Sequence, residues 1–101
     1  MDRKLEGKVI VVSGGTKGVG RAAAEAFALN GAKVVIGGRD EESAMKSIRL
    51  MKVYGTEGLF VYTDLNKVED CKKLFDEAYL KFGKIDGFFN YFDSFQLSFK
   101  E

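Results

Sequence analysis

The feature that most constrains the fold is a short β-branched run that leads directly into a glycine-rich turn. The run, residues 8–13, is apolar throughout its centre, as in a strand that is buried on both faces of a sheet. The turn, residues 13–20, is rich in glycine and opens a helical pattern that continues to residue 30. A buried strand that turns sharply into a helix is typical of a parallel β-α-β unit.

Three further strand-like runs follow, at residues 33–36, 59–62 and 87–91, with helical patterns between them. The order of elements is therefore β-α-β-α-β-α-β, with short connections. Such alternation favours a parallel sheet with right-handed crossovers, and we expect the strand order 3-2-1-4 of a Rossmann-like α/β fold. We expect this fold to be truncated after the fourth strand, in a chain of one domain at most.

The three helices are predicted from capping residues and apolar stripes. Gly31 stands where a C-terminal cap of the first helix belongs, and Asp40 is a good N-cap for the second. Asn66 is the expected N-cap of the third, with Glu69 completing a capping box. The stripes that should face the sheet are Val19, Ala23, Ala26 and Phe27, then Ala44, Ile48 and Met51, then Val68, Cys71, Phe75, Ala78 and Phe82.

The glycine-rich turn also carries the main chemical signal. Gly14 lets the chain leave the strand sharply, Gly18 allows a pyrophosphate to approach the backbone, and Gly20 lets the helix pack closely. The start of the helix offers unpaired N–H groups and a positive dipole end to phosphates. The alternative is a glycine-rich connection without a ligand, but the position between a buried strand and a helix favours a dinucleotide site.

These features resemble the short-chain dehydrogenase/reductase family. Residues 13–20 resemble its Thr-Gly-x-x-x-Gly-x-Gly turn, with Ser for Thr, and residues 82–86 resemble its usual approach to the fourth strand. Asp64 and Leu65 resemble an acidic motif whose carboxylate binds the adenine amino group, although a turn role alone is the alternative for Asp64. The resemblance covers residues 5 to about 91 and implies hydride transfer between NAD(P) and an alcohol or carbonyl.

Two basic residues bear on the choice of cofactor. NAD-preferring folds place an acid at the end of the second strand, where this chain has Gly38 followed by Arg39. Lys17 resembles the second basic residue of NADP-dependent family members. The alternative is that both are ordinary surface charges, but the two matching positions favour NADP(H) over NAD(H). The predicted cofactor-binding residues are Gly14, Thr16, Lys17, Gly18, Val19, Gly20, Arg39, Asp64, Leu65 and Asn90.

The family resemblance stops at the fourth strand. Where the family has Asn-Asn-Ala-Gly, this chain has Asn90 followed by Tyr91, Phe92 and Asp93, and a Phe there should crowd the nicotinamide-side ribose. We therefore divide the chain into a dinucleotide-binding domain, residues 1–91, and a tail without family resemblance, residues 92–101. A shifted reading frame or a truncation near residue 91 would explain this tail.

The catalytic groups that the resemblance implies are missing from this sequence. The family uses a Ser and a Tyr with a Lys four residues later. Gly58, Asn66, Gly83 and Phe95 stand four residues after the four tyrosines. We therefore predict no catalytic residue, and the NADP(H)-binding portion of an oxidoreductase that is inactive as this chain alone. The alternative is a non-catalytic nucleotide-binding or interaction module. A small-molecule substrate is expected only if missing segments complete the site.

Composition argues against several other classes of protein. The chain has no His and one Cys, so we expect no metal site and no internal disulfide. A net charge of +1 gives no reason to expect a nucleic-acid or membrane partner, and we expect a cytoplasmic location. Val9, Val11 and the Phe-rich fourth strand should stay partly uncovered, which favours self-association through an apolar face and an open edge strand.

Overall fold

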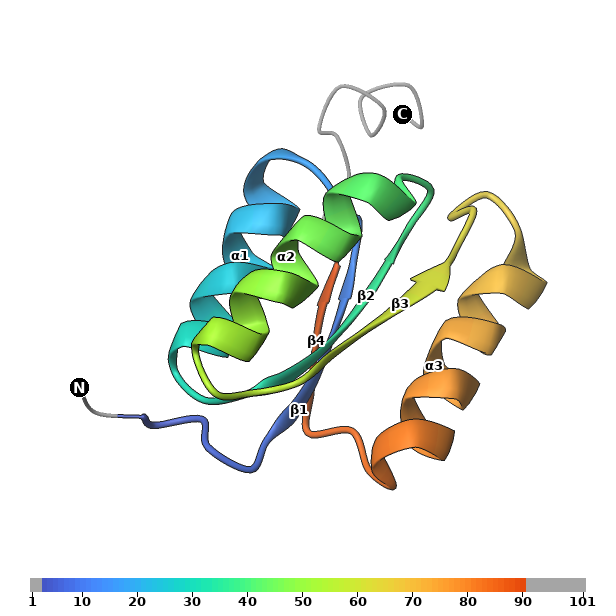
Figure 1. Cartoon of the computed structure of the whole chain (residues 1–101). Coiled ribbons are helices and arrows are strands. Elements are labelled where there is room, and N and C mark those ends of the chain that lie inside the picture. The colour runs from blue at the N-terminus through green and yellow to red at the C-terminus, as the bar shows by residue number, and fades with distance from the viewer. Residues whose placement is uncertain (1–2, 91–101) are drawn as a thin grey trace, which may run out of the picture.

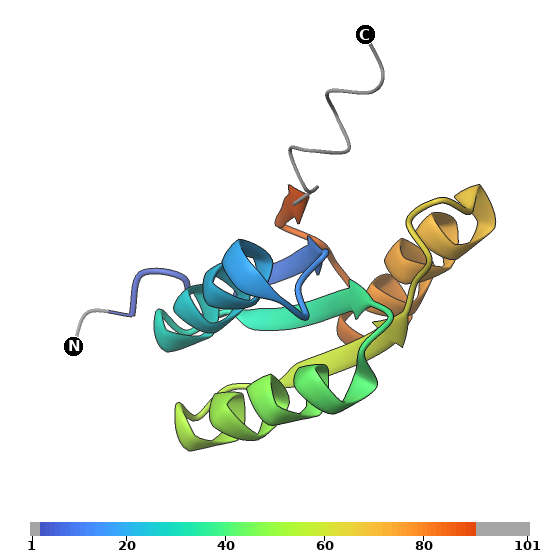
Figure 2. The ribbon, with the colours of Figure 1, turned by 90° about the horizontal axis from the view of Figure 1, so that it is seen from above.

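The computed structural model describes residues 3–90 as helices on both faces of a parallel sheet (Figures 1 and 2). The elements are β1 (Val9–Ser13), α1 (Gly18–Leu29), β2 (Lys33–Gly38), α2 (Glu41–Val53), β3 (Gly58–Tyr62), α3 (Val68–Phe82) and β4 (Gly87–Asn90). All neighbouring strands pair in parallel, in the order β3-β2-β1-β4. The predicted fold class and strand order are therefore confirmed. Tyr91 and the predicted tail lie outside the described residues.

The two faces of the sheet are covered by different helices. Figure 2 shows α1 and α2 on one face and α3 on the other. Alternate strand residues point to opposite faces, so a strand that is covered on both sides is apolar at successive positions. On the first face, the core consists of Ile10, Val12, Ala24, Ala28, Ala32, Val34, Ile36, Ala44, Ile48 and Met51. On the second face, it consists of Val11, Val35, Val61, Leu74 and Ala78.

The predicted apolar stripe of α1 is correct for Phe27, which packs against the core, and wrong for Val19 and Ala26, which are exposed. The buried positions are Gly20, Ala24 and Ala28, whereas Val19 is 55% exposed. The reason is close backbone packing, since a Cβ on Gly20 would lie only 1.9 Å from the carbonyl oxygen of Gly14. The helix therefore presents its smallest residues to the turn and the centre of the sheet, while Phe27 packs partly buried against the core and contacts Phe89 of β4.

The start of α3 also differs from the prediction. The helix begins after Lys67, and Asn66 is not its N-cap. The backbone N–H of Asn66 instead donates to the Asp64 carboxylate at 3.0 Å, and this local turn takes the place of the expected capping box. The stripe of α3 is centred on the buried Leu74, which the sequence interpretation did not include, while Val68 is 82% exposed.

The expectation of an uncovered second face is wrong for β1 and correct for part of β4. Val9 is 1% exposed and Val11 is 0% exposed, because α3 packs over β1 as well as β3. Phe88, in the edge strand β4, remains 50% exposed although its ring contacts the Phe75 ring of α3, with 4.9 Å between the ring centroids. Within residues 3–90, no helix is long and apolar enough to cross a membrane.

Candidate functional site

The predicted site residues gather at one edge of the sheet. The glycine-rich turn follows β1, Arg39 follows β2, Asp64 and Leu65 lie just beyond β3, and Asn90 ends β4. Because all four strands are parallel, their carboxyl ends share the upper edge of the sheet in Figure 1. In open α/β sheets, ligands bind outside the carboxyl ends of the strands.

The glycine-rich turn is fixed to the neighbouring strand by its backbone. Gly14 has a φ of +74°, a conformation that side chains other than glycine rarely adopt. Its N–H donates to the Gly37 carbonyl of β2 at 2.9 Å, and the N–H of Gly15 donates to the same oxygen at 3.3 Å. The turn is therefore held at a defined position beside the end of β2.

The start of α1 has the features of an anion-binding helix terminus. Lys17 is the N-cap and makes no side-chain capping bond, and the first turn of α1 has no acidic residue. By contrast, α2 has an aspartate cap and two glutamates in its first turn, and α3 has two acids there. Gly18 has a φ of +54°, and a Cβ at this position would meet no atom within 4 Å. A phosphate could therefore approach this backbone freely, so the site fits the cofactor that the glycine pattern implies.

Thr16 connects the turn with the end of β2. Its side chain is 7% exposed and faces Gly38, whose added Cβ would lie 2.9 Å from the Thr16 Cγ2 and 3.2 Å from its Oγ1. A side chain at this position would therefore force the Thr16 side chain to move, in addition to any effect on a ligand.

The two predicted cations come from adjoining loops. Arg39 is exposed at the end of β2, and the next residue, Asp40, is the N-cap of α2. The pKa of the Asp40 carboxyl lies below its usual range, chiefly because the backbone N–H and the hydroxyl of Ser43 donate to it. The glycine-rich turn meets the end of β2 where Thr16 faces Gly38, so Lys17 and Arg39, the next residues, lie on adjoining loops. The charge of Lys17 lowers the pKa of Asp40 further.

The residues after β3 and β4 are also engaged within the protein. One oxygen of the Asp64 carboxylate accepts the Asn66 N–H, as in the turn role left open for this residue, and the Asp64 N–H donates to the Asp70 carboxylate at 2.9 Å. The Ser13 hydroxyl donates to the side-chain oxygen of Asn90, which links the ends of β1 and β4. Leu65 is partly buried beside this edge of the sheet.

Sequence reasoning missed two residues that shape this edge. Gly37 accepts the hydrogen bonds of the turn, and a Cβ on it would lie 2.6 Å from Cδ2 of Leu74. The signal available was the Gly37-Gly38 pair, since glycines in a strand often mark a close approach. The second is Ser43, which holds the Asp40 carboxylate with both its N–H and its hydroxyl.

A hollow of about 250 Å³ lies elsewhere, at the amino ends of β1 and β4. It is lined by Leu5, Lys8, Ile10, Asp86 and Gly87. The Asp86 carboxylate accepts the Val9 N–H at 2.8 Å, so it has a structural role in joining the two strands. Within residues 3–90, no group of three His, Cys, Asp or Glu side chains could hold a metal ion.

Comparison with known proteins shows the family of this chain. The family model described as short chain dehydrogenase matches residues 8–91. This chain belongs to the short-chain dehydrogenase/reductase family. An uncharacterized oxidoreductase of Listeria monocytogenes is 38% identical over 84% of the chain and 34% of its own length. The NADPH-dependent aldehyde reductase 1 of Arabidopsis thaliana, described as chloroplastic, is 37% identical over 86% of the chain and 33% of its own length.

The structural comparison agrees with this assignment. The crystal structure of glucose dehydrogenase of Caenorhabditis elegans, in its apo form, has a TM-score of 0.81 and 28% identity. The match covers 96% of this chain and 42% of that one. Short-chain dehydrogenases use nicotinamide dinucleotide cofactors. This chain spans about a third of the length of the curated relatives that it matches.

Proposed function

We propose that this chain is the NADP(H)-binding portion of an oxidoreductase of the short-chain dehydrogenase/reductase family. The observation that carries the proposal is the start of α1, which has neither a side-chain cap nor an acid in its first turn and is open at Gly18. The first N–H groups of a helix have no partner within it, and the dipole makes this end attractive to phosphate. The cofactor pyrophosphate would bind at Gly18, Val19 and Gly20.

The preference for NADP(H) would come from the two cations beside this helix terminus. Arg39 can donate two parallel hydrogen bonds to phosphate oxygens, and Lys17 adds a compact charge. Gly38 offers no carboxylate to repel the 2′-phosphate or to bind the ribose hydroxyl that NADH has instead. A relative that is named as NADPH-dependent supports this choice.

The remaining contacts would involve the ends of β3 and β4. The Asp64 carboxylate gives one oxygen to its own turn, and its second oxygen can accept from the adenine amino group. Leu65 would border the adenine. Asn90, linked to Ser13 beside the glycine-rich turn, would brace the sheet next to the nicotinamide half of the cofactor.

Hydride transfer needs groups that these 101 residues do not contain, since no Tyr has a Lys four residues later. We therefore propose that this chain alone binds the cofactor without turnover, and that substrate binding belongs to further residues of a complete enzyme. The second candidate is a non-catalytic nucleotide-binding or interaction module. It is favoured by Phe92 and Asp93, which replace the small residues of the family beside the cofactor.

Paired glycine substitutions test the nucleotide site. Gly18 and Gly83 both have positive φ, +54° and +80°, and a Cβ at either would meet no atom within 4 Å. Gly18→Ala and Gly83→Ala therefore impose a similar backbone strain, but only Gly18 lies at the proposed site. We expect Gly18→Ala to weaken NADPH binding by about 10-fold or more in a fluorescence titration, equivalent to one charge-assisted hydrogen bond. Gly83→Ala should bind like wild type, and equal affinities in both variants would contradict the assignment.

A further inference from the structure

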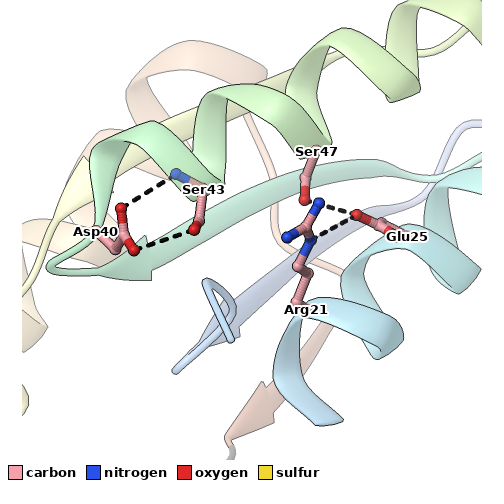
Figure 3. Close-up of polar contacts among 5 residues, drawn as sticks. All are labelled: Arg21, Glu25, Asp40, Ser43 and Ser47. Atoms are coloured by element: carbon pink, nitrogen blue, oxygen red, sulfur yellow. Dashed lines mark hydrogen bonds and ion pairs between the residues drawn. The ribbon is translucent and has the colours of Figure 1, made fainter. Parts of the chain in front are cut away.

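A carboxylate directly follows Arg39 on the loop that adjoins Lys17, but it is held by α2. Figure 3 shows Asp40 at the start of α2 with both carboxylate oxygens directed at Ser43. One oxygen accepts the Ser43 N–H at 3.1 Å, and the other accepts the Ser43 hydroxyl at 3.0 Å. A single residue in the first turn of α2 therefore engages both oxygens.

Neither neighbouring cation pairs with this carboxylate. The ion pairs within residues 3–90 include no contact of Asp40 with Arg39 or Lys17. Arg39 is nevertheless the adjacent residue, and Lys17 is near enough for its charge to favour the ionised Asp40. A carboxylate is the ordinary protein partner of both cations, and it competes for the same donors as a phosphate.

We propose that Ser43 keeps the Asp40 carboxylate on α2, and so leaves Arg39 and Lys17 available to the 2′-phosphate of NADPH. This inference rests on the proposed function and adds a specificity-determining pair that does not itself contact the phosphate. If the hydroxyl of Ser43 is lost, the carboxylate oxygen that it held becomes free to pair with either cation, while the other oxygen stays on the Ser43 N–H. The strength of NADPH binding then falls, while NADH, which has no 2′-phosphate, is unaffected.

Two substitutions test separately the charge of Asp40 and the hydrogen bond that Asp40 accepts from the Ser43 hydroxyl. Ser43→Ala removes the hydroxyl but keeps the N–H bond to Asp40. It should weaken NADPH binding by about 2- to 5-fold, the range of an exposed ion pair, and leave NADH binding unchanged. Asp40→Asn keeps an oxygen for the cap and removes the charge, so it should strengthen NADPH binding by a similar factor. In the Asp40→Asn background, Ser43→Ala should have no further effect.

Ser47→Ala is the matched control. It is the same substitution one turn later in α2, where the buried hydroxyl of Ser47 donates to Glu25 of α1 at 2.8 Å (Figure 3). Arg21 donates to the same carboxylate oxygen at 3.0 Å. Ser47→Ala should lower the melting temperature through this contact between α1 and α2. It should not change the ratio of the NADPH and NADH affinities, because Asp40 stays on Ser43.

Calorimetric titration of each variant with NADPH and NADH measures both affinities and tests the role of Ser43. The inference is overturned if Ser43→Ala weakens both nucleotides equally, if it changes neither, or if it acts as strongly in the Asp40→Asn background. If the wild-type chain binds neither nucleotide, the proposed function fails and this inference falls with it. Normal NADPH binding that does not respond to Ser43→Ala overturns the inference alone.

Discussion

An aspartate in place of Gly38 should reverse the cofactor preference, provided that Thr16 makes room for it. The new Cβ would lie 2.9 Å from the Thr16 Cγ2, whereas carbon atoms in contact prefer about 3.5–4.0 Å. Overpacking of this kind costs about 1–3 kcal/mol of unfolding free energy. Thr16→Ser removes the Cγ2 atom, so the double variant Thr16→Ser/Gly38→Asp should regain most of the stability that Gly38→Asp loses.

The expected change in affinity follows from what the new carboxylate would do to each ligand. It would repel the 2′-phosphate and pair with Arg39, and the loss of one charge-assisted hydrogen bond, about 1.5–3 kcal/mol, weakens NADPH binding by about 10- to 150-fold. It would accept a ribose hydroxyl of NADH and strengthen that binding by about 2- to 10-fold. Calorimetry on wild type, Thr16→Ser and the double variant measures both. A folded double variant with an unchanged preference would show that position 38 does not determine the choice of cofactor.

Three further outcomes are expected. Arg39→Ala should weaken NADPH binding by about 10- to 150-fold and leave NADH binding nearly unchanged. The difference between the NADPH and NADH affinities of the wild type should shrink as salt is added. Equal losses for the two nucleotides in calorimetry would show that Arg39 does not bind the 2′-phosphate. The pKa of Asp86 is lowered, first by the Val9 N–H and then by Lys84, so its contribution to stability is complete above its ordinary pKa of 3.8 and is lost as the pH falls through the lowered value. Chemical denaturation should therefore show a shallower loss of stability in acid for Asp86→Asn than for wild type, and identical acid profiles would contradict this. Light scattering should show that the chain self-associates through the edge strand β4, and Phe88→Lys should reduce this association. A wild-type monomer at high concentration would contradict this.

Most of the fold could be predicted because the residue patterns of the single elements and the rules of sheet topology indicate the same fold. The β-branched runs mark strands covered on both faces, and the strand-helix alternation leaves few possible sheet orders. The close packing of α1 at Gly20 was predicted from the glycine pattern, and a Cβ there would lie 1.9 Å from the Gly14 carbonyl oxygen. The burial of Ala24 and Ala28 follows from this contact, and a search for large apolar side chains does not find it. Leu74, by contrast, could have been predicted, since it lies three residues after Cys71 and four before Ala78 on the same face of the helix.

The candidate site could be predicted only where it consists of residues that follow strands. Parallel topology brings Lys17 and Arg39 to one edge of the sheet, because both residues follow strands and their placement depends only on the backbone. The bond from the Ser43 N–H to Asp40 follows from the predicted N-cap. The contact of Thr16 with Gly38 and the bond from the Ser43 hydroxyl to Asp40 depend on side-chain geometry, which residue spacing does not give.

Chemical shifts in the presence of NADPH would show which edge of the sheet binds the nucleotide. We predict that NADPH perturbs the backbone amides of Gly18, Val19 and Gly20 and the side chain of Arg39, and that NADH perturbs the same amides without Arg39. Perturbations confined to the hollow around Lys8 and Asp86, at the opposite ends of the strands, or no perturbation by either nucleotide, would contradict a nucleotide site at the carboxyl ends of the strands.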